Sequence, residues 1–135
     1  MEYFIKASSI ANQDATIHIK ESNIHFGTTS QTATTLPNPA ELFLGSFTAC
    51  MLKNVERFSH MMKFTYTKAA VKVNATRLEH PPRMDNINYE LTIYGNDDKL
   101  NIDLLKKNIE KFGTIFNTVK FSCDITGTIL TERDV

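Results

Sequence analysis

The hydrophobic residues of this chain are densest in residues 38–62, NPAELFLGSFTACMLKNVERFSHMM. Between Leu42 and Leu52, only small or uncharged polar residues interrupt the hydrophobic ones. A helix of this composition is apolar on almost every side, which is typical of a helix that is buried all round. The pattern therefore predicts a long central helix that the remainder of the chain covers, with one cysteine, Cys50, in its middle.

The start of this predicted helix carries three matching signals. Asn38 suits the N-cap, Pro39 suits the first helical position, and Glu41 falls three residues after the cap. Side chains of these types at that spacing bond each other's backbone N–H groups, an arrangement called a capping box. We therefore expect the helix to begin at Asn38 and Glu41 to contribute to its cap.

Segments in which apolar and polar residues alternate flank the central helix on both sides. Alternation with period two, rich in β-branched residues, indicates strands with one buried face. It occurs in residues 3–7, 15–20 and 24–26, before a polar surface loop at 27–37, and again in residues 66–77, 87–94 and 119–127. Ile102–Phe112 instead shows the apolar stripe of a helix, closed by Gly113 and followed by a short turn or helix at 114–118.

This order of strands and helices predicts an α+β fold in which antiparallel sheets wrap around the central helix. The length fits a single domain that comprises residues 1–135. One chain of this size has little left with which to cover a helix that is apolar all round. A second subunit is therefore expected to complete the covering, which makes the protein a homodimer.

Composition narrows the classes of partner. Fifteen basic residues balance fifteen acidic ones, so no net field attracts nucleic acid. The apolar run Leu42–Leu52 is about half of the ~20 residues that a membrane span needs, and the N-terminal residues hold no long apolar run of the signal-peptide kind. Two cysteines are too few for a disulfide framework. We expect a reduced, cytoplasmic protein that binds neither nucleic acid nor membranes.

The four histidines, His18, His25, His60 and His80, show no spacing typical of a metal site. His60 follows Cys50 at a distance of roughly 15 Å along a helix, which is too far for a Cys–His catalytic pair. No metal ion or other cofactor is therefore expected.

Three segments carry a family resemblance. The first reads PNPAELF at 37–43, then Gly45-Ser46, then Thr48-Ala49-Cys50. The second, VNATRLEHPPRMDNINYELTIYG, covers residues 73–95, and the third, KKNIEKFGTIFNTVKFSCDITGTI, covers residues 106–129. In this order they resemble the first-cysteine motif, the long hairpin, and the second helix with the last strand of the OsmC/Ohr family, the osmotically inducible and organic hydroperoxide resistance proteins. The resemblance covers nearly the whole chain.

This resemblance implies an intertwined α+β homodimer with two long helices buried at its centre. It also implies thiol chemistry, because characterised family members reduce organic or hydrogen peroxides with a reactive cysteine. A second cysteine then resolves the sulfenic acid as a disulfide. Dithiols such as lipoyl groups, or small thiols, supply the electrons.

Carried over residue by residue, the resemblance assigns the peroxidatic cysteine to Cys50, a residue that must be a thiolate within reach of substrate. The alternative for Cys50 is a small buried hydrophobic residue. The family's resolving cysteine falls on Gly113, so this chain lacks it. Cys123 lies further on, where its alternation with Phe121 and Ile125 predicts a packing role.

The groups that activate the family's thiolate are also changed. The family arginine comes from the N-terminal strand region, but this chain has no arginine before Arg57. The family glutamate falls on Ala40, and Glu41, one place along, lies roughly opposite Cys50 on a helix, which makes it a weak catalytic candidate. Lys53 and Arg57 share the helix face of Cys50. Either they stabilise its thiolate or they extend into solvent.

Two functions remain open on these residues. The first is one-cysteine, thiol-dependent reduction of organic hydroperoxides in oxidative stress defence, with Cys50 as the reactive thiol and an external thiol as the reductant. The second is a non-catalytic family member that binds an apolar small molecule or senses oxidants through Cys50. The absence of the resolving cysteine and of the family arginine leaves open whether the protein is an enzyme.

Overall fold

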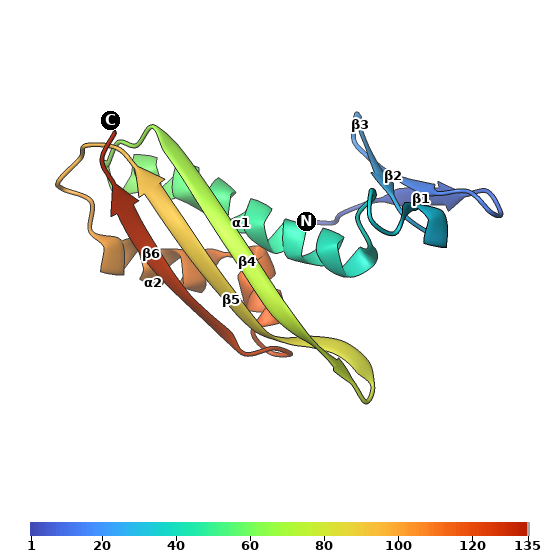
Figure 1. The fold of residues 1–135 in the computed structure, drawn as a ribbon. Helices are drawn as coiled ribbons and strands as arrows, with labels where there is room; N and C mark the ends of the chain where they lie inside the picture. Colours follow the sequence, from blue (N-terminus) through green and yellow to red (C-terminus); the bar gives the residue numbers. More distant parts are fainter. Residues whose placement is uncertain (135) are drawn as a thin grey trace. The chain divides into compact units, whose positions relative to one another are not determined.

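A computed structural model describes residues 1–134 of the chain, which form two compact units that adjoin in sequence between Phe43 and Leu44. Val135, the last residue of the predicted domain 1–135, lies outside the described residues. The elements follow the predicted order of three strands, a long helix, two strands, a second helix and a last strand (Figure 1). The assignment of all of them to one domain stays a prediction.

The first unit contains a three-stranded antiparallel sheet in the order β1-β2-β3. Its strands are β1 Lys6–Ser9, β2 Ala15–Ile19 and β3 Ser22–Phe26, followed by the 3-10 helix η1 Ser30–Thr32. The strand predicted at 3–7 begins later, at Lys6, and all four residues of β1 are exposed. Alternation at an exposed N-terminus has no buried face to fix its register, which is why the sequence misplaces this strand.

One carboxylate organises the loop that follows β3. The Oδ1 atom of Asp14 accepts hydrogen bonds from Thr32 Oγ1 at 2.7 Å and from the backbone N–H groups of Thr28 and Thr29 at 3.1 and 3.3 Å. The hydroxyl of Thr32, ahead of the two backbone groups, holds the pKa of Asp14 below its usual range. The polar segment 27–37 is therefore an ordered loop.

Helix α1, Pro39–Met61, begins with the predicted capping box. Asn38 Oδ1 accepts the backbone N–H of Glu41 at 2.8 Å, and Glu41 Oε1 accepts the backbone N–H of Asn38 at 3.1 Å. Both side chains thereby satisfy N–H groups that have no partner inside the helix. The predicted start of the helix is confirmed.

The second unit contains a sheet in the order β4-β5-β6, with strands β4 Lys68–Glu79, β5 Pro82–Tyr94 and β6 Ile125–Glu132. Strands β4 and β5 form a long antiparallel hairpin, whereas β5 and β6 are parallel. The α+β class is confirmed, but the expectation of antiparallel sheets is wrong for this last pair. The reason is the connection: helices α2 Ile102–Phe112 and α3 Thr114–Val119 carry the chain back to the end where β5 began, as a parallel pair requires.

Two strand boundaries also differ from the sequence-based expectation. The strand predicted at 87–94 begins earlier, at Pro82, a position at which a strand tolerates the missing N–H of proline. The last strand begins at Ile125, because residues 119–123 still belong to α3 and the turn after it: the N–H of Cys123 bonds Val119 O at 3.0 Å. Phe121, predicted on the apolar face, is 85% exposed.

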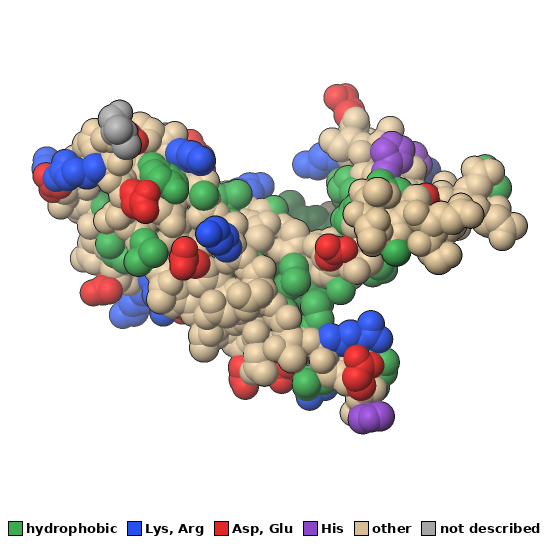
Figure 2. Space-filling view, viewed as in Figure 1, with side chains coloured by type: hydrophobic (Ala, Val, Ile, Leu, Met, Phe, Trp, Pro, Cys, Tyr) green, Lys and Arg blue, Asp and Glu red, His purple; other side chains and the backbone are tan. Residues whose placement is uncertain are grey.

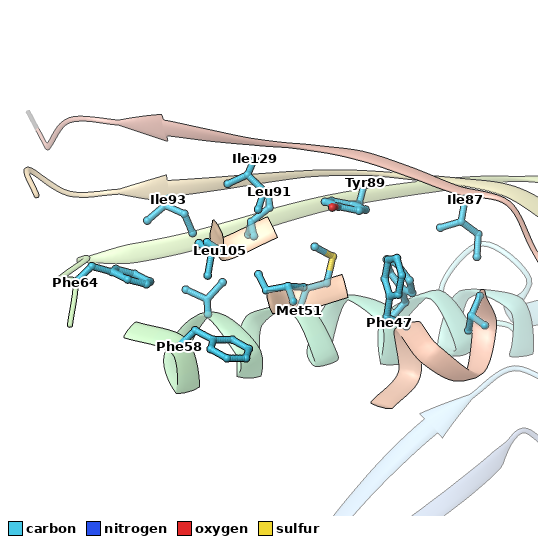
Figure 3. Close-up of a cluster of buried hydrophobic side chains, with 14 residues drawn as sticks. Phe47, Met51, Phe58, Phe64, Ile87, Tyr89, Leu91, Ile93, Leu105 and Ile129 are labelled. Atoms are coloured by element: carbon cyan, nitrogen blue, oxygen red, sulfur yellow. The ribbon is translucent and has the colours of Figure 1, made fainter. Parts of the chain in front are cut away.

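The core of the second unit lies between α1 and the sheet (Figure 3). Alternate residues of β5 point toward the helix, and residues at helical spacing on α1 and α2 point toward the strand. The residues 0–2% exposed are Phe47, Met51, Val55 and Phe58 from α1, Ile87, Tyr89, Leu91 and Ile93 from β5, and Leu105 and Ile109 from α2. Burial of this apolar surface is the main stabilising term of the unit.

Within the described residues of the second unit, nothing covers the opposite side of α1. Gly45, Ala49 and Leu52 lie one turn apart on that side and are exposed, Leu52 to 37%. The second unit therefore buries one face of α1, and the predicted burial on all sides would need a further covering. No helix in residues 1–134 is long and apolar enough to span a membrane.

The outer face of the second sheet is polar. Lys72 of β4 pairs across the sheet with Glu90 of β5, which in turn pairs with Thr128 of β6, and all three are exposed. Figure 2 views this face, with acidic and basic side chains interspersed over the strands. The sheet thus has one face in the core and one in solvent, as its period-two pattern predicts.

Gly127 of β6 offers a test of this packing. It pairs with Tyr89, and a Cβ added at Gly127 would lie 2.1 Å from Tyr89 Cε1. We expect Gly127→Ala to lower the free energy of unfolding by about 3 kcal/mol or more, at the upper end of the cost of overpacking. Urea unfolding followed by circular dichroism measures this loss.

The matched control for this substitution is Thr128→Ala, the next residue of the same strand on the exposed face, for which we expect a change within about 0.5 kcal/mol. A loss below about 1 kcal/mol for Gly127→Ala would contradict the packing of the Tyr89 ring over this glycine.

Candidate functional site

Cys50 lies on α1 at the border of its buried face and is partly exposed. One turn further along, the amide nitrogen Nδ2 of Asn54 donates to Cys50 Sγ at 3.5 Å and to the carbonyl oxygen of Cys50 at 2.9 Å. Asn54 itself is 7% exposed. The sulfur of Cys50 is therefore in contact with a buried hydrogen-bond donor from its own helix.

Gly113, at the junction of α2 and α3, lies against the same sulfur. A Cβ added at Gly113 would stand 3.3 Å from Cys50 Sγ, 3.2 Å from Phe116 Cβ and 2.9 Å from the carbonyl oxygen of Ile109. The backbone of Gly113 is extended, with φ −71° and ψ 118°, a conformation open to any residue. The close approach of these neighbours, rather than the backbone conformation, therefore explains why this residue is a glycine. The structure brings together Cys50 and Gly113, as the sequence resemblance implies.

Ring contacts fix the junction of α2 and α3 against α1 on either side of Cys50. Phe116 of α3 packs on Phe47 with ring centroids 5.9 Å apart, and Phe112 of α2 packs on Phe58 at 5.9 Å. Aromatic pairs at such separations add to the stabilisation from burial. The distance between Gly113 and the sulfur is thus set by core packing.

The two predicted cationic neighbours do not bind the sulfur. Among residues 1–134, neither Lys53 nor Arg57 is hydrogen-bonded or ion-paired to Cys50, and both are exposed. The guanidinium of Arg57 instead lies 5.4 Å from the ring centroid of Phe58. Glu41 is engaged in the capping box with Asn38. The solvent-facing alternative therefore describes Lys53 and Arg57 in this chain.

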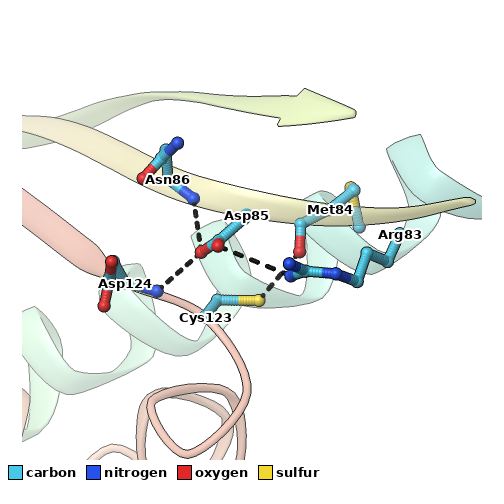
Figure 4. A network of polar contacts seen from close by, with 6 residues as sticks. All are labelled: Arg83, Met84, Asp85, Asn86, Cys123 and Asp124. Carbon is cyan, nitrogen blue, oxygen red and sulfur yellow. Dashed lines mark hydrogen bonds and ion pairs between the residues drawn. The ribbon is translucent and has the colours of Figure 1, made fainter. Parts of the chain in front are cut away.

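Cys123 lies in the turn before β6, in a polar network with the start of β5 (Figure 4). Its Sγ donates to the carbonyl oxygen of Met84 at 3.2 Å. Asp85 Oδ1 accepts the backbone N–H groups of Asn86 at 2.8 Å and Asp124 at 2.9 Å. Burial, followed by the charge of Asp85, raises the pKa of the Cys123 thiol. Cys123 is therefore held as a thiol in a structural turn.

Sequence reasoning did not single out Asn54. The available signal was an amide residue at i+4 from Cys50, on the face of α1 that otherwise carries hydrophobic residues.

Two hollows of the second unit, of about 300 and 450 Å³, share Thr65 in their linings, and neither is lined by Cys50.

Comparison with protein-family models matches residues 31–127 to the family of OsmC-like proteins. The chain belongs to the OsmC-like family. Comparison with curated protein sequences finds no match. The match to the family model includes α1 with Cys50, and it also includes Gly113.

Solved structures of OsmC-like proteins share the fold. The chain is similar to an OsmC-like protein from Mycoplasma pneumoniae, with 16% identity, a TM-score of 0.85, and coverage of 98% of this chain and 99% of that one. It is similar to an organic hydroperoxide resistance protein OsmC from Legionella pneumophila, with 12% identity, a TM-score of 0.67 and 98% of each chain covered. It is also similar to the organic hydroperoxide resistance protein OhrB of Bacillus subtilis, with 13% identity, a TM-score of 0.61, and 94% and 98% covered.

The position of Gly113 in this OsmC-like protein gives a direct test of the site geometry. We expect Gly113→Cys to form a disulfide with Cys50 on mild oxidation, because the added Cβ would lie 3.3 Å from Cys50 Sγ, and across an S–S bond of about 2.05 Å the Cβ of one cysteine lies roughly 3 Å from the sulfur of the other. The backbone must shift by a few tenths of an ångström to relieve the contact with Ile109. Mass spectrometry of the intact protein and alkylation of free thiols measure the bond.

Gly113→Ser, which adds a side chain of similar size without sulfur, and Gly113→Cys combined with Cys50→Ser are the matched controls, and neither should gain a disulfide. If a folded Gly113→Cys protein keeps all of its thiols open to alkylation after oxidation, the placement of this junction against Cys50 is wrong.

Proposed function

We propose that the protein is a thiol-dependent peroxidase of the one-cysteine type, which reduces organic hydroperoxides through Cys50. Three observations support this proposal: membership of the OsmC-like family, the words "organic hydroperoxide resistance" in the names of similar structures, and the position of Cys50. The position carries most weight, because Cys50 is partly exposed and its sulfur lies against Gly113, where the family resemblance places the resolving cysteine.

In the proposed reaction, the thiolate of Cys50 attacks the terminal oxygen of the hydroperoxide. The S–O bond forms as the O–O bond breaks, and the alkoxide leaves with a proton as an alcohol. Sulfur loses two electrons and becomes a sulfenic acid. An external thiol attacks the sulfenic sulfur, releasing water and forming a mixed disulfide, and a second thiol restores Cys50 with release of the external disulfide.

An external reductant is required by the residues around the sulfur. Gly113 carries no thiol. The thiol of Cys123 donates a hydrogen bond to Met84 O, in a turn where burial raises its pKa. A thiol in that state is a poor attacking group. Such reductants are abundant in the cytoplasm, which is the compartment we propose.

The second candidate function retains a role for Cys50 without catalytic turnover of peroxide. Among residues 1–134, no cation contacts the sulfur, and Glu41 is engaged in the helix cap. A thiol without a cationic neighbour reacts more slowly with peroxide. This observation favours a sensor that is oxidised at Cys50, or a carrier of an apolar small molecule, over an enzyme.

We also propose that the protein is a homodimer in which the second chain covers the free side of α1. Gly45, Ala49 and Leu52 lie on that side and are exposed in one chain. Contiguous exposed apolar surface on a soluble protein marks an interaction site. Small residues on a helix allow a second helix to approach closely.

Cys50→Ser tests the enzymatic proposal. With cumene hydroperoxide as substrate and dithiothreitol or dihydrolipoamide as reductant, we expect the wild-type protein to consume peroxide catalytically and Cys50→Ser to fall to the background rate of the free thiol, because the attacking sulfur is gone. Cys123→Ser is the matched control and should keep the wild-type rate.

If Cys50→Ser retains the wild-type rate, the proposal is wrong. If wild-type protein turns over no peroxide but a single equivalent oxidises Cys50 to the sulfenic acid, the sensor function replaces it.

Ala49→Arg tests the dimer. We expect the wild-type protein to scatter light during size-exclusion chromatography as a particle of twice the 15.3 kDa chain mass, and Ala49→Arg to elute as a folded monomer or an unfolded chain, because a buried unpaired charge is costly. Thr128→Arg, on the polar outer face of the sheet, should remain dimeric. A monomeric wild-type protein would rule out the proposed covering of α1.

A further inference from the structure

Asn54 is a buried polar residue in an otherwise apolar stretch of α1. It is 7% exposed, between Met51 and Phe58 of the core. Asparagine is unfavourable in the interior of a helix, and a buried amide without partners costs free energy. The partners of its Nδ2 are both on Cys50: the carbonyl oxygen at 2.9 Å and the sulfur at 3.5 Å.

We propose that Asn54 is the positioning residue of Cys50, whose amide N–H orients the sulfur and stabilises its thiolate. The consequence for peroxide reduction rests on the proposed function, whereas the effect on the thiolate does not. Nδ2 carries two N–H groups and lies within hydrogen-bond distance of two acceptors. We assign one N–H to the helix carbonyl, which anchors the amide, and the other to the sulfur.

Ser59 shows that α1 can accommodate a buried polar group without involving Cys50. It is also 7% exposed, and its hydroxyl donates to the carbonyl oxygen of Glu56 at 2.7 Å. A hydroxyl has a single donor and is satisfied by one carbonyl, whereas the amide of Asn54 has two donors. Asn54 differs from Ser59 in having this second donor, and the acceptor for that donor is the sulfur of Cys50.

A donor at the sulfur favours the charged form. A hydrogen bond from an N–H to a thiolate is charge-assisted, and it is stronger than the same bond to a neutral thiol. Hydrogen bonding to the charged form of a group shifts its equilibrium toward that form. In a site where neither Lys53 nor Arg57 contacts the sulfur, the amide supplies the stabilisation that a cation would otherwise give.

The test is the pH dependence of Cys50 alkylation by iodoacetamide, which reports the thiolate and needs no peroxide. All proteins carry Cys123→Ser, so that one thiol reacts. Asn54→Ser keeps a bond to the helix carbonyl of the kind that Ser59 makes and removes the second donor, Asn54→Leu keeps the branched shape, removes both donors and adds no charge, and Ser59→Ala is the matched control. Lys53, Arg57 and Lys111 remain in every variant, so differences report the amide.

We expect the midpoint of alkylation to rise by about 0.5 pH unit or more in Asn54→Ser, which is about a threefold loss of rate below the midpoint, and by at least as much in Asn54→Leu. Ser59→Ala should leave the midpoint within about 0.2 unit. Circular dichroism and urea unfolding establish that each variant is folded, and Asn54→Leu carries the test if Asn54→Ser does not fold.

An unchanged midpoint in a folded Asn54 variant overturns the inference, and so does an equal shift in Ser59→Ala, which would show a general loosening of α1. The proposed function fails separately: if wild-type protein consumes no hydroperoxide while Asn54→Ser still shifts the alkylation midpoint, the peroxidase proposal is wrong and the role of Asn54 stands.

Discussion

The packing of one face of α1 against the inner face of β5 is the contact on which the second unit depends. Strand β5 lies at the centre of its sheet, and α1 is the longest helix of the described residues. A hydrophobic face of a helix and one face of a sheet can each be buried only against another element, so the two define the core together. The side chains that meet there are Phe47, Met51, Val55 and Phe58 with Tyr89, Leu91 and Ile93.

The site follows from this packing. Cys50 precedes Met51 in sequence, so the burial that fixes Met51 also fixes the position of Cys50 along the length of the sheet. The junction of α2 and α3 is brought to the sulfur by Phe116 and Phe112, whose rings lie on Phe47 and Phe58. A thiol positioned by a packed core has few alternative positions, because interiors deform little.

Much of this arrangement can be predicted from sequence, and the exceptions have physical causes. The capping box of α1 and the bounds of α2 depend on neighbouring residues, which a sequence displays directly. The direction of β6 relative to β5 depends on a crossover through two helices, which local alternation does not encode. Residues 119–123 alternate by coincidence, because their hydrogen bonds go back to α3. For the site, the family resemblance pairs Cys50 with Gly113, but Asn54 becomes visible only when its amide is seen at the sulfur.

The two groups that lie against the Cys50 sulfur act in one direction. A thiolate with a cation beside it reacts quickly with peroxide, and a second cysteine close by removes the sulfenic acid quickly. Here a neutral amide contacts the sulfur and a glycine faces it. On the proposed chemistry, both features slow the cycle: formation of the sulfenic acid lacks a full positive charge, and its removal waits for an external thiol. The lifetime of oxidised Cys50 is then set by the concentration of that thiol. A one-cysteine peroxidase and an oxidant sensor are therefore two regimes of the same site, separated by how fast the external thiol arrives.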